Sequence, residues 1–504
     1  MATLKSIKNK YLQTSDGDTL GVSDNSDNVA LLAFKMQAAD SIAKFNMVDG
    51  FADAYADASG IDASASTNEI RNATGFYSAS EVGTVTGGTI SDYSTGGVDY
   101  KVHTFTSDGD FVVSAGSATI SYLIVGGGGA GGGVHGGGGG AGGVLHVTSE
   151  TCASGTYAAV VGDGGARMTT CRSGQAQAGD DSTFKGQTAD GGGRGGKYGG
   201  TAAQRSGGAG GSGGGGGAHS GPEGPNGSGG SSSQSDPING VSGTGYGNVG
   251  AAGSYGGGDR RGNGGGGGAG EAGNTDGTMF GGDGVQINID GNNYYVGGGG
   301  GGGDWNGSGN GAGGDGGGGG GGAASGGSGG AAGGGPARNA GTAGASNAHG
   351  GDAGANTGSG GGGSGQCGHA GFSGRGGAGG SGIVQVRYVE DSFVSYLDLT
   401  LVSNSVTAAA QPDTADIVAT YTNGAGTATL NTDIKYYVSR DNGTTYTEAT
   451  MVSQGTSGGH SMISARNIDI SGQPAGTTMR YKVTTHNQSA AKETRAQAVS
   501  LAWA

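Results

Sequence analysis

The chain has 504 residues, of which 129 are glycine and only 6 are proline. Charged residues make up 13%, and the net charge of -15 argues against binding to the phosphate backbone of nucleic acids. The sequence has no run of 18 or more apolar residues that would insert in a membrane, and no apolar signal segment near its start.

Residues 1–75 have an ordinary composition and contain one predicted helix, from Val29 to Phe51. Apolar residues recur along it three or four positions apart, as one helical face requires: Leu32, Met36, Ala39, Ala43 and Met47. Two interpretations stay open. The helix could belong to a small packed domain, or it could serve docking or oligomerisation.

Residues 76–125 are predicted to form a β-element that leads into the glycine-rich part of the chain. Polar and apolar residues alternate around Val102–Thr106, and a Ser-Asp-Gly turn precedes Phe111. An apolar strand over Ile120–Val125 then runs directly into Gly126–Gly129.

Residues 126–388 are dominated by glycine, a composition that favours disorder. Two features oppose disorder. The tracts are nearly pure glycine and alanine rather than a solubilising mixture. They are also interrupted by strand-like pieces at Gly143–Thr148, Tyr157–Val161, Val285–Ile289, Tyr294–Val296 and Gly382–Tyr388. Collagen is excluded, because there is no Gly-X-Y period.

We therefore expect this segment to fold as a bundle of polyglycine II helices. Each is a left-handed extended helix with about three residues per turn and no internal hydrogen bonds. Neighbouring tracts would bond to one another through their backbones, and only glycine allows so close an approach.

Residues 393–504 are predicted to form a small antiparallel β-domain. Its expected strands are Leu397–Val402, Asp416–Tyr421, Ile434–Val438, Met479–Thr485 and Ala496–Trp503, with Leu501 and Trp503 sealing the core. The expected fold class is thus mostly β with a large polyglycine II helical bundle, a short N-terminal α-helical region and a C-terminal β-sandwich-like domain.

Motifs that could carry chemistry lack their required context. The GxGxxG-like run after Val125 is followed by more glycine instead of a helix, and the Walker-like run Gly191–Lys197 is followed by Tyr198. The three cysteines, Cys152, Cys171 and Cys367, form no CxxC pair, and the histidines are scattered. The Asp-box-like hairpin at Ser439–Tyr446 is interpreted as structural. We predict no catalytic residue, no metal site and no cofactor.

Binding is expected instead from the non-glycine inserts between tracts, because loops on a rigid scaffold commonly carry recognition. Aromatic and arginine side chains suit contact with a glycan or a protein. The candidate receptor-binding residues are Trp305, Arg260, Arg261, Tyr255 and Tyr246.

Several runs resemble the glycine-rich domain of bacteriophage tail-fibre adhesins, of the type found in marine phages. They are Thr104–Thr106, Asp108–Phe111, Tyr122–Gly129, Gly139–Val144, Val161–Gly165, Asp181–Phe184 and Gly379–Val384. The run Val29–Asn46 is similar to openings of such proteins.

The resemblance implies a non-catalytic virion fibre protein that binds a bacterial surface receptor, either a glycan or an outer-membrane protein. It also implies attachment to other tail proteins through the N-terminal region. We further expect a homotrimer, because fibres on a symmetric particle are usually closed cyclic assemblies and the predicted helix at Val29–Phe51 offers an apolar face. The alternatives are a cellular glycine-rich surface or matrix adhesin and a glycan-cleaving tailspike.

Overall fold

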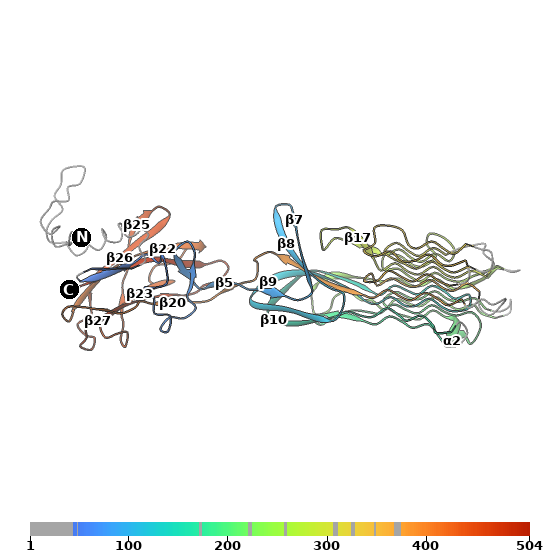
Figure 1. Cartoon of the computed structure of the whole chain (residues 1–504), viewed down its shortest axis with the longest axis horizontal. Helices are drawn as coiled ribbons and strands as arrows, with labels where there is room; N and C mark the ends of the chain where they lie inside the picture. Colours follow the sequence, from blue (N-terminus) through green and yellow to red (C-terminus); the bar gives the residue numbers. More distant parts are fainter. Residues whose placement is uncertain are drawn as a thin grey trace. The chain divides into compact units, whose positions relative to one another are not determined.

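The computed structural model describes residues 44–504 except 48, 171–173, 220–223, 257–259, 306–310, 324–327, 347–348 and 367–373. These residues form two compact units (Figure 1). Unit 1 combines the described residues up to Val82 with Val394–Ala504, and unit 2 spans Gly83–Phe393. Strands account for 39% of the structure and α-helix for 1%. No described helix has the length and apolar character needed to cross a membrane.

The predicted helix at Val29–Phe51 is wrong where the structure describes it. Residues Lys44–Met47 form β1 and Gly50–Asp53 form β2, an antiparallel pair in which Met47 lies opposite Gly50. The reason is tertiary, because β2 also pairs with the C-terminal strand β28 (Glu493–Trp503), with Phe51 opposite Leu501. Residues 29–43 of the predicted helix lie outside the described residues.

Unit 1 contains two antiparallel sheets. One has the order β1-β2-β28-β22-β26-β25, with β3 and β4 joined at its side, and the other has the order β20-β27-β23-β24, with β21 paired to β27. Their strands are β3 (Ile70–Asn72), β4 (Phe76–Ser78), β20 (Thr400–Val402), β21 (Val406–Thr407), β22 (Thr414–Ala425), β23 (Ile434–Ser439), β24 (Thr447–Ala449), β25 (Val452–Ser457), β26 (His460–Asp469) and β27 (Thr478–Thr485). A further pair joins β5 (Ser80–Val82) to β19 (Val394–Tyr396).

Side chains from both ends of the chain share the core of unit 1. Phe51 stacks on Tyr481 with ring centroids 5.6 Å apart, and Tyr55 and Tyr77 lie in the same apolar cluster. Leu501 and Trp503 belong to this cluster, as predicted. Four of the strands expected in the C-terminal segment are confirmed within β22, β23, β27 and β28, and of Leu397–Val402 only Thr400–Val402 is a strand, β20. The described residues up to Val82 and Val394–Ala504 therefore fold as one body.

Unit 2 begins and ends in one large antiparallel sheet with the order β12-β11-β10-β9-β18-β8-β7. Its strands are β7 (Thr89–Thr95), β8 (Val98–Phe105), β9 (Gly109–Val125), β10 (Val144–Val160), β11 (Ser182–Phe184), β12 (Gln187–Ala189) and β18 (Ile383–Val389), with β6 (Val85–Thr86) on β9 and β13 (Ser242–Tyr246) on β10. The last strand, β18, lies between β8 and β9 and bonds to both. This sheet thus brings together the chain entering and leaving the glycine tracts.

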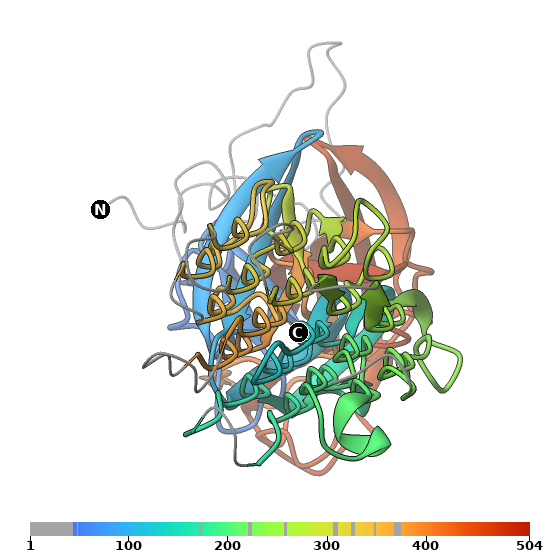
Figure 2. The ribbon, with the colours of Figure 1, turned by 90° about the vertical axis from the view of Figure 1, so that its right-hand side faces the viewer.

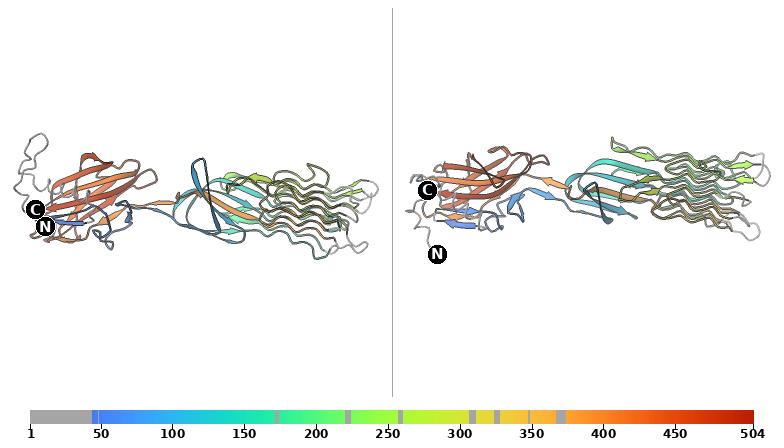
Figure 3. Two further views of the ribbon diagram at one scale, coloured as in Figure 1. Left: turned by 45° about the horizontal axis from the view of Figure 1, so that its top comes forward. Right: turned by 90° about the horizontal axis from the view of Figure 1, so that it is seen from above.

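The glycine tracts between residues 126 and 382 lie side by side (Figures 1 and 3), and the end view shows them packed in several rows (Figure 2). Their backbones bond laterally: Gly139 N donates to Gly361 O at 2.8 Å, and Gly300 N donates to Gly139 O at 2.9 Å. We call this part of unit 2 the glycine array. Its short elements are α2 (Ala202–Arg205), β14 (Ser254–Gly256), β15 (Arg260–Gly262), β16 (Val285–Ile287) and β17 (Tyr294–Val296).

The expected polyglycine II helical bundle is wrong as a fold class. The described residues hold several antiparallel sheets and no helical bundle. The physical reason is the pairing of the strands next to the tracts, because β9, β10 and β18 carry the chain into and out of the tracts within one large antiparallel sheet. The expectation that tracts bond laterally is itself met by these contacts.

Close approach explains why the tracts are glycine. A Cβ on Gly127 would lie 2.0 Å from the carbonyl oxygen of Asp163, and one on Gly138 would lie 1.9 Å from that of Gly300. Neither separation is tolerated by real Cβ atoms. Alanine occurs where a methyl group has room in an apolar cluster, as Ala130 does beside Met168.

Candidate functional site

The predicted receptor-binding residues fall in two places in unit 2. Tyr255, Arg260 and Arg261 belong to the β14–β15 hairpin, in which Tyr255 lies opposite Arg261. An isolated antiparallel bridge joins Gly262 to Asp304, and therefore brings the hairpin next to Trp305 in the chain. The side chains of residues 255–261 lie outside the described part of the structure, so their contacts stay a prediction.

Trp305 lies against a histidine at a chain reversal. Its ring centroid is 4.4 Å from that of His135, and His135 also meets Tyr198 edge-on at 5.3 Å. His135 is 1% exposed and adopts a positive φ of 47° directly after Val134, which has a φ of 54°. Trp305 is only partly buried, so the three rings pack together while part of the Trp305 side chain stays accessible to solvent.

Sequence reasoning missed the contribution of His135 and Tyr198 to this group. The available signal was position, because Val134 and His135 interrupt an otherwise glycine-rich run from Gly126 to Gly140. A pair of bulky residues inside such a run marks a reversal, where side chains leave the lateral hydrogen-bond network.

Tyr246 does not join the other candidates. It ends β13, lies opposite Val144 in β10, and packs against an apolar cluster that includes Leu123 and Ile383. Its apolar contacts place it with the large sheet of unit 2. Tyr246 is partly buried and contributes to packing, and its part in recognition stays a prediction, as it does for Trp305 and the β14–β15 hairpin.

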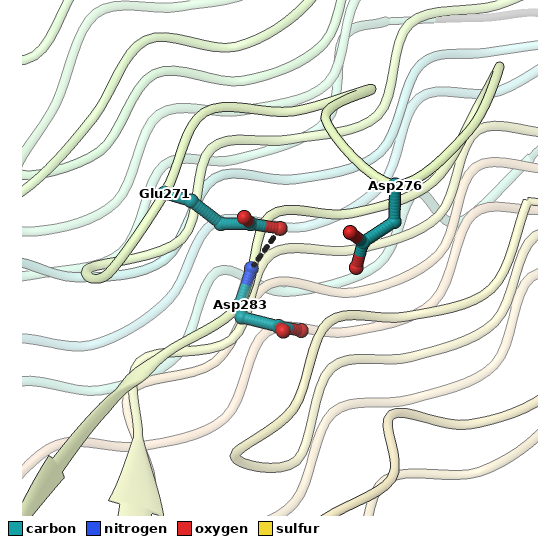
Figure 4. A group of neighbouring side chains, drawn as sticks. All are labelled: Glu271, Asp276 and Asp283. Atoms are coloured by element: carbon teal, nitrogen blue, oxygen red, sulfur yellow. Dashed lines mark hydrogen bonds between the residues drawn. The ribbon is translucent and has the colours of Figure 1, made fainter.

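A second group in the array is acidic. Glu271, Asp276 and Asp283 bring carboxylate oxygens within 4.8 Å of one another (Figure 4). Glu271 Oε1 accepts a bond from Asp283 N at 3.3 Å, and Asp283 Oδ1 accepts one from Asp315 N at 2.7 Å. Burial, with neighbouring negative charges, raises the pKa of Glu271 above its ordinary value. Calcium takes about 6–8 oxygen ligands, so three carboxylates alone do not define a metal site.

The Asp-box-like hairpin of unit 1 is held by its own hydrogen bonds. The Asp441 carboxylate accepts bonds from Thr445 N at 2.9 Å and 3.1 Å, from Thr445 Oγ1 at 2.8 Å and from Ser439 Oγ at 2.7 Å. A carboxylate engaged in this way stabilises the turn and is poorly placed to act on a ligand.

The geometry therefore favours binding surfaces on the glycine array as the candidate sites. Comparison of the chain with protein-family models, with curated proteins and with solved structures finds no match.

Proposed function

We propose that the chain is a non-catalytic attachment protein of a bacteriophage tail fibre, which binds a receptor on the surface of a bacterial host. The observation that carries this proposal is the lateral hydrogen bonding of the glycine array. Backbone groups committed to neighbouring tracts make a stiff body, and recognition is left to side chains at the reversals and inserts.

The array supplies the physical properties that such a protein needs. Its loops are anchored on both sides by tracts, so they lose less conformational entropy when a ligand binds than free loops would. The β14–β15 hairpin and Trp305 combine arginine and aromatic side chains, the residue types most enriched at binding hot spots. We assign receptor contact to this region.

Two further assignments belong to the same proposal. The N-terminal region would bind other virion tail proteins, and the chain would assemble as a homotrimer. Phe51, at the end of the predicted helix, is covered in the core of unit 1 and offers no apolar surface for a trimer contact. The trimer therefore rests on the cyclic symmetry that fibres on a symmetric particle usually have.

Adsorption of the purified full chain to host cells tests receptor contact. Replacing Trp305, Arg260 and Arg261 together with alanine should lower adsorption at least tenfold while the thermal transitions of both units stay unchanged. The control is the double variant Lys435→Ala with Arg466→Ala. It also removes two positive charges, but from unit 1, which contains none of the three replaced residues. A folded triple variant that adsorbs like the control would refute this assignment.

A further inference from the structure

A surface cleft of about 230 Å³ lies in unit 2, and none of the residues assigned to receptor contact lines it. Its lining comes from three elements: Tyr93, Ser94 and Thr95 from β7, Asn288 and Gly291 from the connection between β16 and β17, and Arg387 from β18. Pockets that enclose drug-sized ligands span roughly 300–1,000 Å³. The cleft therefore suits one small unit of a longer ligand.

Arg387 forms the centre of the cleft. Its Nε donates to Ser121 Oγ at 2.9 Å and its Nη1 donates to Tyr93 Oη at 2.9 Å. Its Cζ also lies 5.2 Å from the centre of the Tyr100 ring, which stacks on Tyr93 at 5.3 Å. The guanidinium is thus oriented before any ligand arrives.

The charge of Arg387 is not neutralised by a described carboxylate. The neighbouring acid, Asp290, directs its Oδ2 to Arg338 Nη1 at 3.0 Å and to Gln385 Nε2 at 3.1 Å. Burial and the positive charge of Arg387 both lower the pKa of His146, which keeps that ring neutral. A guanidinium has five N–H donors, and among the described residues Nη2 of Arg387 has no hydrogen-bond partner.

The rim offers uncharged polar groups. Among the described residues, Asn288 Nδ2 and Thr95 Oγ1 make no hydrogen bond, and both side chains are exposed. Gly291 allows the loop to lie against Tyr93, because a Cβ there would be 3.0 Å from the ring and its φ is +85°. The lining therefore combines one oriented cation with hydroxyl and amide groups and has no aliphatic side chain.

We propose that this cleft binds the carboxylate of an acidic sugar residue, such as a uronic acid within a surface polysaccharide. The carboxylate accepts a charge-assisted hydrogen bond from Nη2 of Arg387, the guanidinium nitrogen that has no partner among the described residues. Thr95 and Asn288 bond to the hydroxyl groups of the ring. The proposal does not depend on the receptor region assigned above, because the two sites share no residue.

Binding of methyl β-D-glucuronide to the full chain, followed by titration calorimetry or ligand-observed NMR, tests the proposal. We expect methyl β-D-glucoside, which lacks the carboxylate, to bind at least tenfold more weakly. Acetate, which lacks the ring, should also bind at least tenfold more weakly. Equal affinity for the glucoside would refute pairing with Arg387, and equal affinity for acetate would reduce the cleft to a general anion site.

Two variants separate binding from folding. Arg387→Gln removes the charge, and Thr95→Glu places a negative charge at the exposed rim while leaving the bonds of Arg387 intact. Both should weaken glucuronide binding at least tenfold. Thr89→Glu is the matched control, because Thr89 is an exposed residue of the same strand that does not line the cleft. Equal loss in Thr89→Glu and Thr95→Glu, or no glucuronide binding by the unaltered chain, would overturn the proposal.

Discussion

Adding one methyl group inside the glycine array should destabilise unit 2 strongly, and Gly319 is the clearest position for this test. A Cβ on Gly319 would lie 2.1 Å from Gly351 O and 2.8 Å from Gly362 N. Both contacts are with backbone atoms, so no side chain can rotate away. The tracts must separate locally by about 1 Å to reach an ordinary contact distance.

Such a separation breaks hydrogen bonds that have no alternative partner. Gly319 N donates to Gly360 O at 3.0 Å, Gly301 N donates to Gly319 O at 2.9 Å and Gly351 N donates to Gly320 O at 2.8 Å. Each buried group left without a partner costs about 1–3 kcal/mol. Loss of two or three bonds therefore lowers the free energy of unfolding of unit 2 by about 2–9 kcal/mol. At about 2 °C per kcal/mol for a large unit, the Tm falls by about 4–18 °C.

Scanning calorimetry of Gly319→Ala and Gly277→Ala measures this effect. Gly277 is the matched control, because a Cβ there would meet only the Phe280 ring, at 3.5 Å, an ordinary van der Waals distance. The thermal transition of unit 1 provides an internal reference. If the two variants unfold within about 1 °C of each other, the argument from close packing of the tracts is wrong.

The remaining predictions concern the array, the acid stability of unit 1, a buried thiol and assembly. Amides of Gly298–Gly303 and Gly318–Gly322 should exchange far more slowly than in a free peptide, because their N–H groups bond to neighbouring tracts; exchange at free-peptide rates would contradict the lateral network. Hydrogen bonds from Ser64 and Arg480 lower the pKa of Asp62 to about 2, so this carboxylate stabilises unit 1 above about pH 4, and its contribution is lost as the pH falls toward 2. In Asp62→Asn the free energy of unfolding of unit 1 should depend less on pH between about 4 and 2 than in the unaltered chain. An unchanged pH dependence would count against this assignment. Cys152 is fully buried and burial raises its pKa, so it should resist thiol reagents until unit 2 unfolds; rapid labelling of the native chain at this residue would refute this. Light scattering should give a trimer at micromolar concentration, and a monomer would reject the proposed assembly.

The local pattern of polar and apolar residues predicted many of the strands. Alternating and apolar runs predicted the strands at Ile120–Val125, Tyr294–Val296 and Met479–Thr485, and all three are present. The purity of the glycine tracts also indicated lateral backbone bonding, because a Cβ is excluded only where backbones nearly touch. These inferences succeed because period and steric size act over a few residues.

Only some of the residues in the candidate binding sites could be predicted from the sequence. The bridge from Gly262 to Asp304 supports grouping the hairpin with Trp305, but Tyr246 packs on the large sheet instead. The sequence does not single out His135 or Arg387, because their contacts are with residues distant in the chain: Trp305 for the histidine, Tyr93 and Ser121 for the arginine.

Tertiary structure alone decided the outcome for residues 44–47 and 49–51, the described part of the predicted helix, and which segments make up each unit. The helical spacing of Val29–Phe51 is a local preference worth a fraction of a kcal/mol per residue. Pairing of Phe51 opposite Leu501 supplies backbone bonds and buries a large aromatic ring in the core of unit 1, which contributes more. Long-range pairing also places β18 between β8 and β9, although β18 follows both strands by more than 250 residues. No local pattern encodes such a partner, because the free energy that selects it arises only when distant segments meet.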